Sequence, residues 1–163
     1  MKKITDLRAS LIMANVDLSD WCRNLTPRRI EQVIKKIAFE LDASVVRMSP
    51  VGNPDLWFGG HYVEMFGYPD DYTGGRFRAN WQVGINAKPT GETGEIDQTG
   101  AATLGKGLAV LGSYRIGDTI FILNNVPYSE RLENGWSTQA PHGMVGLTVA
   151  RFESIVNQAA RIR

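Results

Sequence analysis

The chain has 163 residues, 43% of them hydrophobic and 21% charged, with a formal net charge of +1 at pH 7. This length and composition predict one globular domain over residues 1–163 with a sizeable core, and the near-zero charge gives no electrostatic case for nucleic acid or acidic membranes. A single cysteine excludes an internal disulfide and cysteine-based zinc or iron–sulfur sites. We find neither a signal-peptide pattern nor a run of about 20 apolar residues, and therefore expect a soluble intracellular product.

The first half of the chain predicts an arm, a long helix and an aromatic-rich loop. Residues 1–25 form the arm, which contains Trp21 in polar surroundings that fit either a lid on the core or an interface anchor. Residues 26–48 begin with threonine and proline, which are typical N-cap and first-turn residues, and carry an apolar stripe at helical period until a proline ends the helix. Residues 52–75 combine glycine and proline with six aromatic residues, which predicts an ordered loop packed on the domain or on a neighbouring subunit.

The second half predicts two strands and two helices. Residues 76–86 alternate between apolar and polar side chains, as is typical of a half-buried strand. Residues 87–98 are polar and rich in glycine, and we expect a flexible hairpin tip or linker there. Residues 99–114 and 147–162 have apolar side chains at helical spacing, and residues 119–123 form an apolar run typical of a more buried strand. Together these patterns predict an α+β fold, a single domain in which a small, mainly antiparallel sheet packs against the long N-terminal helix and the C-terminal helix.

Residues 126–145, here called the connector, are the most distinctive segment, VPYSERLENGWSTQAPHGMV. Two prolines fix φ and remove backbone donors, and an Asn-Gly pair predicts a tight turn. Tyr128, Leu132 and Trp136 are spaced by four, so they share one face if residues 127–134 are helical. The segment shows neither a nucleophile–base pair nor a set of metal ligands. We therefore interpret the connector as a structural element.

The connector resembles a motif near the C-terminus of the phage tail-component family that includes the tail-completion and tail-terminator (neck) proteins of long-tailed phages. The residues that carry this resemblance are Asn124, Pro127, Tyr128, Leu132, Glu133, Gly135, Trp136, Ser137, Gln139, Ala140, Pro141, Gly143 and Met144. A second stretch, after the helix and the Pro50-Val51 pair, resembles the family's junction between its first helix and first strand. It contains Thr73, Gly74, Gly75, Arg78 and Trp81. The two stretches occur in the family's order, and with the intervening helix they cover residues 26–160, although residues 52–72 depart from the family's shorter junction.

This resemblance implies a structural virion protein of the tail or neck, without catalytic activity or cofactor, that is assembled in the host cytoplasm. Its copies would form a ring, commonly of six, that terminates the tail tube at its head-proximal end. The implied partners are further copies of the chain, the tail tube protein and the head connector or head-completion protein, but neither a membrane nor a specific nucleic-acid sequence. DNA could pass through the lumen.

The same resemblance implies roles for the motif residues. Those of the connector are expected to define the fold and the subunit contacts. Gly74, Gly75, Arg78 and Trp81 are expected to set the helix-to-strand junction. As a hypothesis, Arg78 pairs with a carboxylate such as that of Glu133, within or between subunits.

Two other classes of function stay open at this point. A head-completion or connector protein would form a ring of twelve and contact the portal instead of the tail tube. A small hydrolase or nucleotide-binding enzyme would have to use weaker motifs. Gly100–Lys106 (GAATLGK) matches the start of a phosphate-binding loop, but Gly107 stands where Ser or Thr would hold magnesium.

The remaining candidates for an enzyme are also incomplete. Residues 135–139 (GWSTQ) begin like a nucleophile elbow but end in glutamine, and His142 is too near in sequence to be the usual triad partner. His61 and Glu64 could share a metal on one helical turn, but two ligands do not make a closed site. Cys22 has no clear histidine partner, so we interpret it as a small apolar filler.

Overall fold

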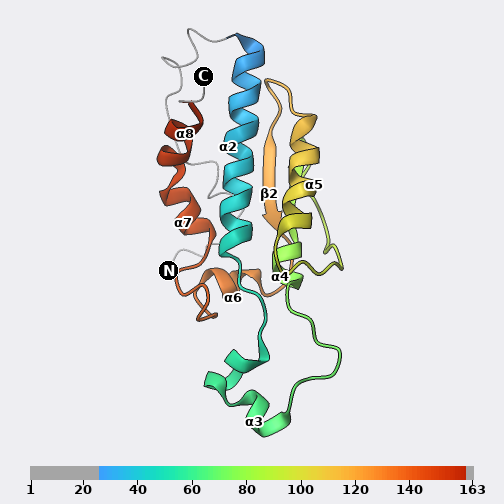
Figure 1. Ribbon diagram of the computed structural model, residues 1–163. Helices are drawn as coiled ribbons and strands as arrows, with labels where there is room; N and C mark the ends of the chain where they lie inside the picture. Colours follow the sequence, from blue (N-terminus) through green and yellow to red (C-terminus); the bar gives the residue numbers. More distant parts are fainter. Residues whose placement is uncertain (1–25, 161–163) are drawn as a thin grey trace, which may run out of the picture.

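The computed structural model describes residues 26–160, except for the side chain of Phe58 (Figure 1). Its elements, in chain order, are α2 (Pro27–Met48), η2 (Pro54–Gly60), α3 (Tyr62–Phe66), α4 (Arg76–Ala79), β1 (Trp81–Ile85), α5 (Ala101–Gly112), β2 (Ile120–Asn124), α6 (Ser129–Glu133), α7 (Val145–Ala150) and α8 (Phe152–Ala160). The predicted arm of residues 1–25, with Trp21 and Cys22, lies outside the described residues, as do residues 161–163. Among the described helices, none is both long enough and apolar enough to cross a lipid bilayer.

The long helix α2 forms where the sequence predicts it. Thr26 is its N-cap, and the Oγ1 atom of Thr26 accepts a hydrogen bond from the backbone N–H of Arg29 at 3.3 Å. The predicted apolar stripe is buried along the helix at Val33, Ile37, Leu41 and Val45. Burial of this stripe stabilises the packing of α2 against the rest of the domain.

The strands β1 and β2 pair antiparallel, with Trp81 opposite Asn124 and Ile85 opposite Ile120. Helix α5 packs against β1 and α2, and α8 lies on the other side of α2 (Figure 1). These contacts confirm the predicted α+β fold, a small single domain with helices packed on an antiparallel sheet. The prediction that the second strand is the more buried one is wrong: β2 is half-buried throughout, because α5 covers β1 instead.

The core consists of two apolar clusters on either end of α2. One joins the C-terminal part of α2 to α4, β1 and the connector, and includes Val46, Phe77 and Met144. The other joins the N-terminal part of α2 to α8. The connector therefore belongs to the core of the domain and is not a peripheral loop.

The strand predicted over residues 76–86 is shorter in the structure. Helix α4 takes the place of its first residues, and β1 begins at Trp81. Phe77 and Trp81 are buried in the same cluster, and their rings make an edge-to-face contact at a centroid distance of 6.1 Å. Apolar residues at positions 77, 79 and 81 fit the two-residue period of a strand, and positions 77 and 81 also fit the spacing of a helix. The pattern of so few residues therefore could not distinguish a strand from a helical turn. Asn80 fixes the turn by donating from Nδ2 to the carbonyl of Arg76 at 2.8 Å.

The single C-terminal helix that was predicted is divided into two. Helix α7 ends at Ala150 and α8 begins at Phe152, with Arg151 between them. The division lets the two halves reach different clusters. Val145 of α7 belongs to the cluster at the C-terminal part of α2, whereas Val156 of α8 packs against the N-terminal part of α2.

Residues 50–75 project beyond the end of α2 as a small lobe (Figure 1). Within the lobe, the ring of Trp57 makes edge-to-face contacts with Tyr62 and Tyr72, at centroid distances of 4.9 and 4.8 Å. In contrast, Phe66 and Tyr68 are 65% and 64% exposed. The aromatic-rich segment therefore packs partly on itself and leaves other rings uncovered.

Residues 87–98 contain no helix or strand, as expected, but they do not close a hairpin. They connect β1 to α5, because the strand that pairs with β1 comes only after that helix. The N–H of Thr93 donates to Oδ1 of Asn80 at 2.9 Å, and Asp97 is buried at the start of α5. The segment is thus tied to the domain at both points.

Candidate assembly interface

Two glycines give the connector its shape. Gly135 and Gly143 have φ values of 81° and 70°, in the left-handed region that favours glycine. A Cβ atom on Gly135 would lie 2.4 Å from the carbonyl oxygen of Pro141, and one on Gly143 would lie 2.3 Å from that of Glu133. The predicted turn at Asn134-Gly135 is therefore present, and the chain closes on itself too tightly for a side chain at either glycine.

The carboxylate of Glu133 holds the end of the connector. Its Oε2 atom accepts hydrogen bonds from the N–H groups of Met144 and Val145 at 2.8 and 2.9 Å, and its Oε1 atom accepts one from Gly146 at 2.9 Å. These are the donors at the start of α7, which have no partner within that helix. A negative charge at this positive end of a helix is favourable as well. Glu133 thus determines where α7 begins.

The second motif builds the turn between the lobe and the sheet. A Cβ atom on Gly74 would lie 2.2 Å from the carbonyl oxygen of Gly52, and Gly75 has a φ of 115°. The indole Nε1 of Trp81 donates to the hydroxyl of Ser49 at 2.7 Å, and both residues are buried. These contacts hold the end of α2 against the start of β1.

Arg78 caps the C-terminal end of α2. Its guanidinium donates to the carbonyl of Ser49 at 2.6 Å and to the carbonyl of Gln98, with a longer contact of 3.5 Å to that of Arg47. A cation is favourable where the last carbonyls of a helix have no partner. Burial lowers the pKa of Arg78 from its usual value, and the charge of Asp97 opposes this effect.

The hypothesis that Arg78 pairs with Glu133 within the subunit is wrong. The guanidinium of Arg78 is held by the carbonyl of Ser49 at the end of α2 and by the carbonyl of Gln98. Both carboxylate oxygens of Glu133 are held by the N–H groups of α7. Each charged group therefore compensates the end of a helix, and a contact between the two groups in different subunits would have to displace those hydrogen bonds.

Gln139 joins the two motifs. Its Oε1 atom accepts from the N–H of Val51 at 3.2 Å, and its Nε2 atom donates to the carbonyl of Val51 at 2.7 Å. Asn124 makes a second link by donating from Nδ2 to the carbonyl of Phe77 at 2.8 Å. We call the connector with Asn124, the Pro50-Val51 pair and residues 73–81, which these hydrogen bonds join, the frame.

The other connector residues divide into buried and exposed ones. Tyr128 and Leu132 pack against the first apolar cluster, as their spacing predicts. Trp136 does not continue that face: it is 77% exposed, because α6 ends before Gly135 turns the chain. The guanidinium of Arg131 lies 5.9 Å from the centroid of the Trp136 ring. Three further motif residues serve the turn or the surface: Pro127 and Pro141 are exposed, and Ser137 accepts a hydrogen bond from the N–H of Gln139 at 3.3 Å.

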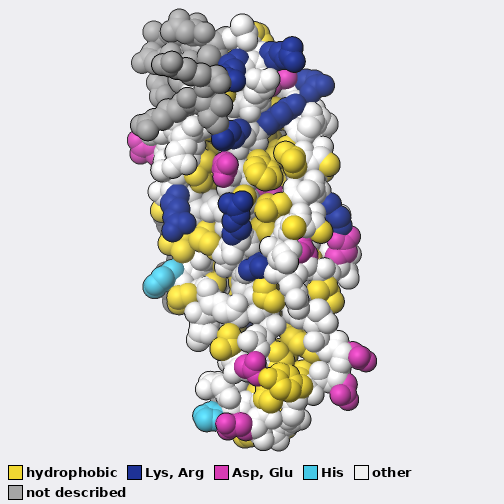
Figure 2. Space-filling view, in the orientation of Figure 1, with side chains coloured by type: hydrophobic (Ala, Val, Ile, Leu, Met, Phe, Trp, Pro, Cys, Tyr) yellow, Lys and Arg dark blue, Asp and Glu magenta, His cyan; other side chains and the backbone are white. Residues whose placement is uncertain are grey.

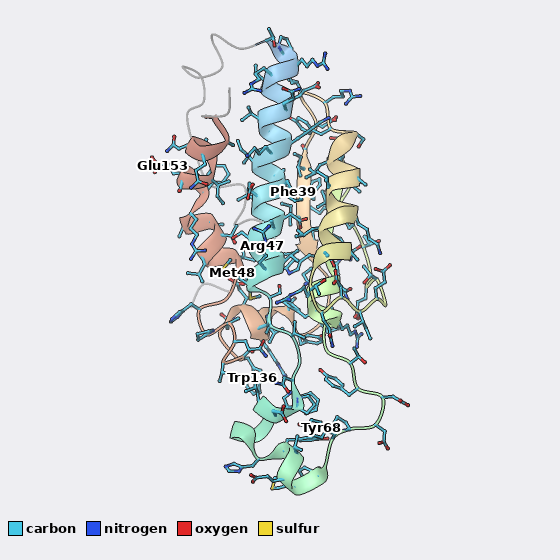
Figure 3. All side chains as sticks on the ribbon, viewed as in Figure 1. Phe39, Arg47, Met48, Tyr68, Trp136 and Glu153 are labelled. Atoms are coloured by element: carbon cyan, nitrogen blue, oxygen red, sulfur yellow. The ribbon has the colours of Figure 1, made fainter. Side chains whose placement is uncertain are left out.

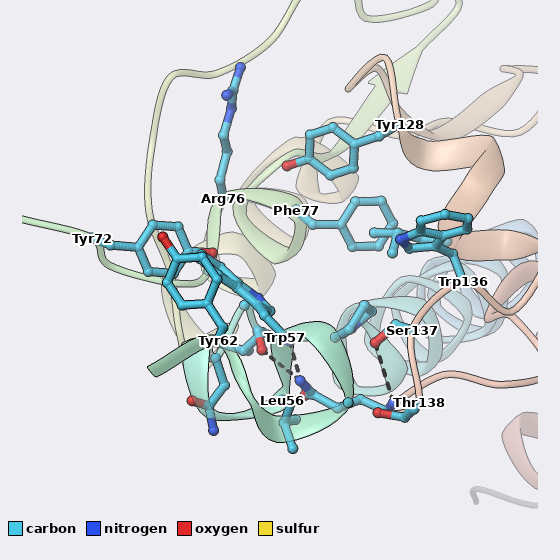
Figure 4. A pocket seen from close by; sticks show the side chains of 18 residues that line it. Leu56, Trp57, Tyr62, Tyr72, Arg76, Phe77, Tyr128, Trp136, Ser137 and Thr138 are labelled. Carbon is cyan, nitrogen blue, oxygen red and sulfur yellow. Dashed lines mark hydrogen bonds between the residues drawn. The ribbon is translucent and has the colours of Figure 1, made fainter. Parts of the chain in front are cut away.

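A cleft of about 660 Å³, here called the aromatic cleft, opens between the lobe and the connector (Figure 4). Its aromatic lining residues are Trp57, Tyr62, Tyr72, Phe77, Tyr128 and Trp136. In Figure 4 the first three stand on the lobe side and the last three stand opposite. Figure 3 places Trp136 where the lobe meets the body of the domain. Among residues 26–160, this lining includes exposed apolar surface, with Trp136 77% and Tyr72 44% exposed.

The motif that resembles a phosphate-binding loop is occupied by the chain itself. Oδ1 of Asp97 accepts from the N–H of Gly100 at 2.8 Å, and Oδ2 accepts from the N–H and the hydroxyl of Thr103, both at 2.8 Å. Burial raises the pKa of Asp97, but these hydrogen bonds outweigh burial and lower it to about 2. A phosphate would meet a carboxylate where such loops present free N–H groups. The geometry therefore disfavours nucleotide binding at Gly100–Lys106.

The predicted histidine–carboxylate pair is present on the lobe. Nδ1 of His61 lies 3.2 Å from Oε2 of Glu64, and both side chains are exposed. Within residues 26–160, no group of three or more His, Cys, Asp and Glu side chains is placed to hold a metal ion. His142 is exposed on the connector. In the part of the chain that the structure describes, His61 and Glu64 thus form a surface pair.

Sequence reasoning missed two buried carboxyl groups. Asp97 could have been found, because an acidic residue just before an apolar helix is a typical start signal. Asp42 is 1% exposed between α2 and α5, and neither of its oxygens has a hydrogen-bond partner among the described residues. Burial raises its pKa to about 7. The signal for Asp42 was its position in the apolar stripe, four residues after Ala38 and three before Val45.

Comparisons of the chain with protein-family models, with curated proteins and with solved structures gave no match. Function is therefore inferred from the residue pattern and from the geometry of the frame and the aromatic cleft.

Proposed function

We propose that this protein is a structural virion protein of a phage tail, assembled as a ring at the head-proximal end. It terminates the tail tube and presents the surface that joins the head connector, and no reaction or cofactor is involved. The observation that carries the proposal is the pairing of Gln139 with Val51, which unites two motif segments that are distant in sequence. The resemblance therefore falls on one structural unit and not on two unrelated stretches.

The use of polar groups in the frame also favours a structural role. The side chains of Glu133, Arg78 and Gln139 all bind backbone groups of this chain, so they hold conformation instead of facing a substrate. The large apolar side chain that the frame leaves exposed is Trp136, which lines the aromatic cleft. Aromatic side chains in a concave apolar surface are typical of interface anchors.

The ring and its position can be tested with the purified full chain. We expect the mass in solution and negative-stain images to show a closed six-fold ring with an open lumen. A twelve-fold ring would favour the head-completion or connector class instead. If the protein is monomeric alone, isolated tail tubes should be added and examined for a cap at one end. Failure to bind the tubes as monomer or as ring would refute the proposal.

The contribution of Trp136 can be separated from folding. Because this side chain is 77% exposed, Trp136→Ala should leave the melting temperature nearly unchanged while it weakens ring formation or tube binding. Leu108→Ala is a matched control, since Leu108 is 56% exposed on α5 and does not line the cleft. Equal loss of assembly in both variants would contradict the assignment of Trp136 to an interface.

A further inference from the structure

The aromatic cleft has the shape and composition of an acceptor for a large apolar side chain. It is bounded by the lobe on one side and by the connector on the other, and rings from both sides line it (Figure 4). Arg76 lies at its edge, where the guanidinium is 2.5 Å from the carboxylate of Glu92. Trp136 belongs to the lining and is largely uncovered. A tryptophan or leucine that enters this space would bury apolar area on both partners.

The chain supplies a suitable segment in residues 16–22, VDLSDWC. Its apolar residues Val16, Leu18 and Trp21 are separated by polar ones, so the segment can offer a tryptophan with acidic neighbours. Those acidic neighbours suit Arg131, whose guanidinium lies beside the Trp136 ring of the cleft.

Trp21 cannot enter the cleft of its own chain. The cleft begins at Pro50 and Val51, just beyond the C-terminal end of α2, whereas Trp21 precedes the N-terminal end. Helix α2 has 22 residues and is therefore roughly 33 Å long. The five residues from Trp21 to Thr26 span at most about 18 Å even when fully extended. If Trp21 occupies the cleft, it must therefore come from a second copy of the chain.

The charges at the two ends of the molecule favour contact between copies. Residues 50–75 carry four acidic residues, Asp55, Glu64, Asp70 and Asp71, and neither lysine nor arginine. The opposite end begins with Arg28 and Arg29 in the first turn of α2. On the face shown in Figure 2, Lys and Arg gather at that end, and the lobe shows acidic and hydrophobic side chains. The basic end of one copy thus complements the acidic lobe of the next.

We infer that neighbouring copies associate head to tail, with Trp21 and the adjoining segment of one copy seated in the aromatic cleft of the next. Such a contact is heterologous, and repeated contacts of this kind close into a ring or continue as a filament. The inference rests on the proposed ring assembly and specifies the contact that closes it.

The single native cysteine makes a direct test possible, because Cys22 is adjacent to Trp21. The variant Thr138→Cys places a second thiol at an exposed position that lines the cleft. After mild oxidation of the full-length variant, a non-reducing gel should show a ladder of dimers, trimers and higher species that collapses on reduction. The ladder should be lost when Cys22→Ser is added, and it should weaken with Arg28→Glu and Arg29→Glu.

Two controls make the result specific. The unmodified chain can form Cys22–Cys22 dimers but no ladder. Thr90→Cys is a matched substitution at an exposed threonine that does not line the cleft, and it should give no ladder either. A ladder of equal strength from Thr90→Cys, or dimers alone from Thr138→Cys, would overturn the inference.

The same preparations separate this inference from the proposed function. Rings or capped tail tubes, without a disulfide ladder from the Thr138→Cys variant, would refute the inference and leave the function in place. A ladder from a protein that does not bind tail tubes would support the inference and refute the function.

Discussion

Replacing Asp42 by asparagine is expected to change the pH dependence of stability. Asp42 is 1% exposed, its oxygens lack hydrogen-bond partners among the described residues, and burial raises its pKa to about 7. In the unfolded chain an aspartate ionises near pH 3.9. Between these two values the folded protein holds a proton that the unfolded chain releases. The contribution of Asp42 to the free energy of unfolding therefore falls as pH rises from about 4 to about 7, and is constant above that range.

The size of the effect follows from the shift. Each pH unit in this window costs about 1.4 kcal/mol, so the total loss is roughly 4 kcal/mol, of which roughly 2.5 kcal/mol falls between pH 5 and pH 8. Asparagine keeps the shape of the side chain but does not ionise. Relative to the unmodified protein, the Asp42→Asn variant should gain that amount of stability between pH 5 and pH 8.

Urea unfolding at several pH values from 5 to 8, followed by tryptophan fluorescence, measures this difference. Asp70→Asn is the control, because Asp70 is exposed on the lobe and its replacement should leave the pH profile unchanged. Parallel profiles for the unmodified protein and the Asp42→Asn variant would show that Asp42 is ionised or solvated in the folded state. The stated environment of this carboxyl group would then be wrong.

Three further sites test packing and capping. Gly107→Ala should lower the free energy of unfolding by about 1–3 kcal/mol, because its Cβ atom would lie 2.5 Å from an oxygen of Asp42. Gly105→Ala, whose Cβ atom meets nothing within 4 Å, should raise the free energy of unfolding by up to about 1 kcal/mol. If urea unfolding showed the Gly107→Ala variant to be more stable than the Gly105→Ala variant, the α2–α5 packing would be contradicted. Glu133→Gln should cost about 1–2 kcal/mol in thermal unfolding, whereas Glu130→Gln on the exposed face of α6 should cost almost nothing; equal effects would argue against the cap on α7. Asp97→Asn should lower the free energy of unfolding by about 2 kcal/mol at pH 7, because a carboxyl group with a lowered pKa stabilises the fold above pH 4. The difference between the variant and the unmodified protein should vanish as pH falls to 2. A difference that does not change with pH would rule out the charged cap.

By itself the sequence determined the features that depend on near neighbours along the chain. The start of α2 follows from a threonine and a proline, and its buried face follows from a stripe at helical period. The turn at Gly135 follows from the ability of glycine to adopt a positive φ. The motif residues of the connector were recognisable as a set for the same reason, since they form one continuous stretch.

Only the tertiary structure decided what those residues do. Glu133 and Arg78 were candidates for a mutual pair, but their partners are the ends of α7 and α2, which folding brings near and sequence spacing does not reveal. Trp136 was expected beside Leu132 and instead faces solvent, because the turn that follows α6 redirects the chain. The division between α7 and α8 likewise depends on two separate apolar clusters. Spacing limits which side chains can share a face, but packing against distant segments selects which of them are buried, paired or left open for a partner.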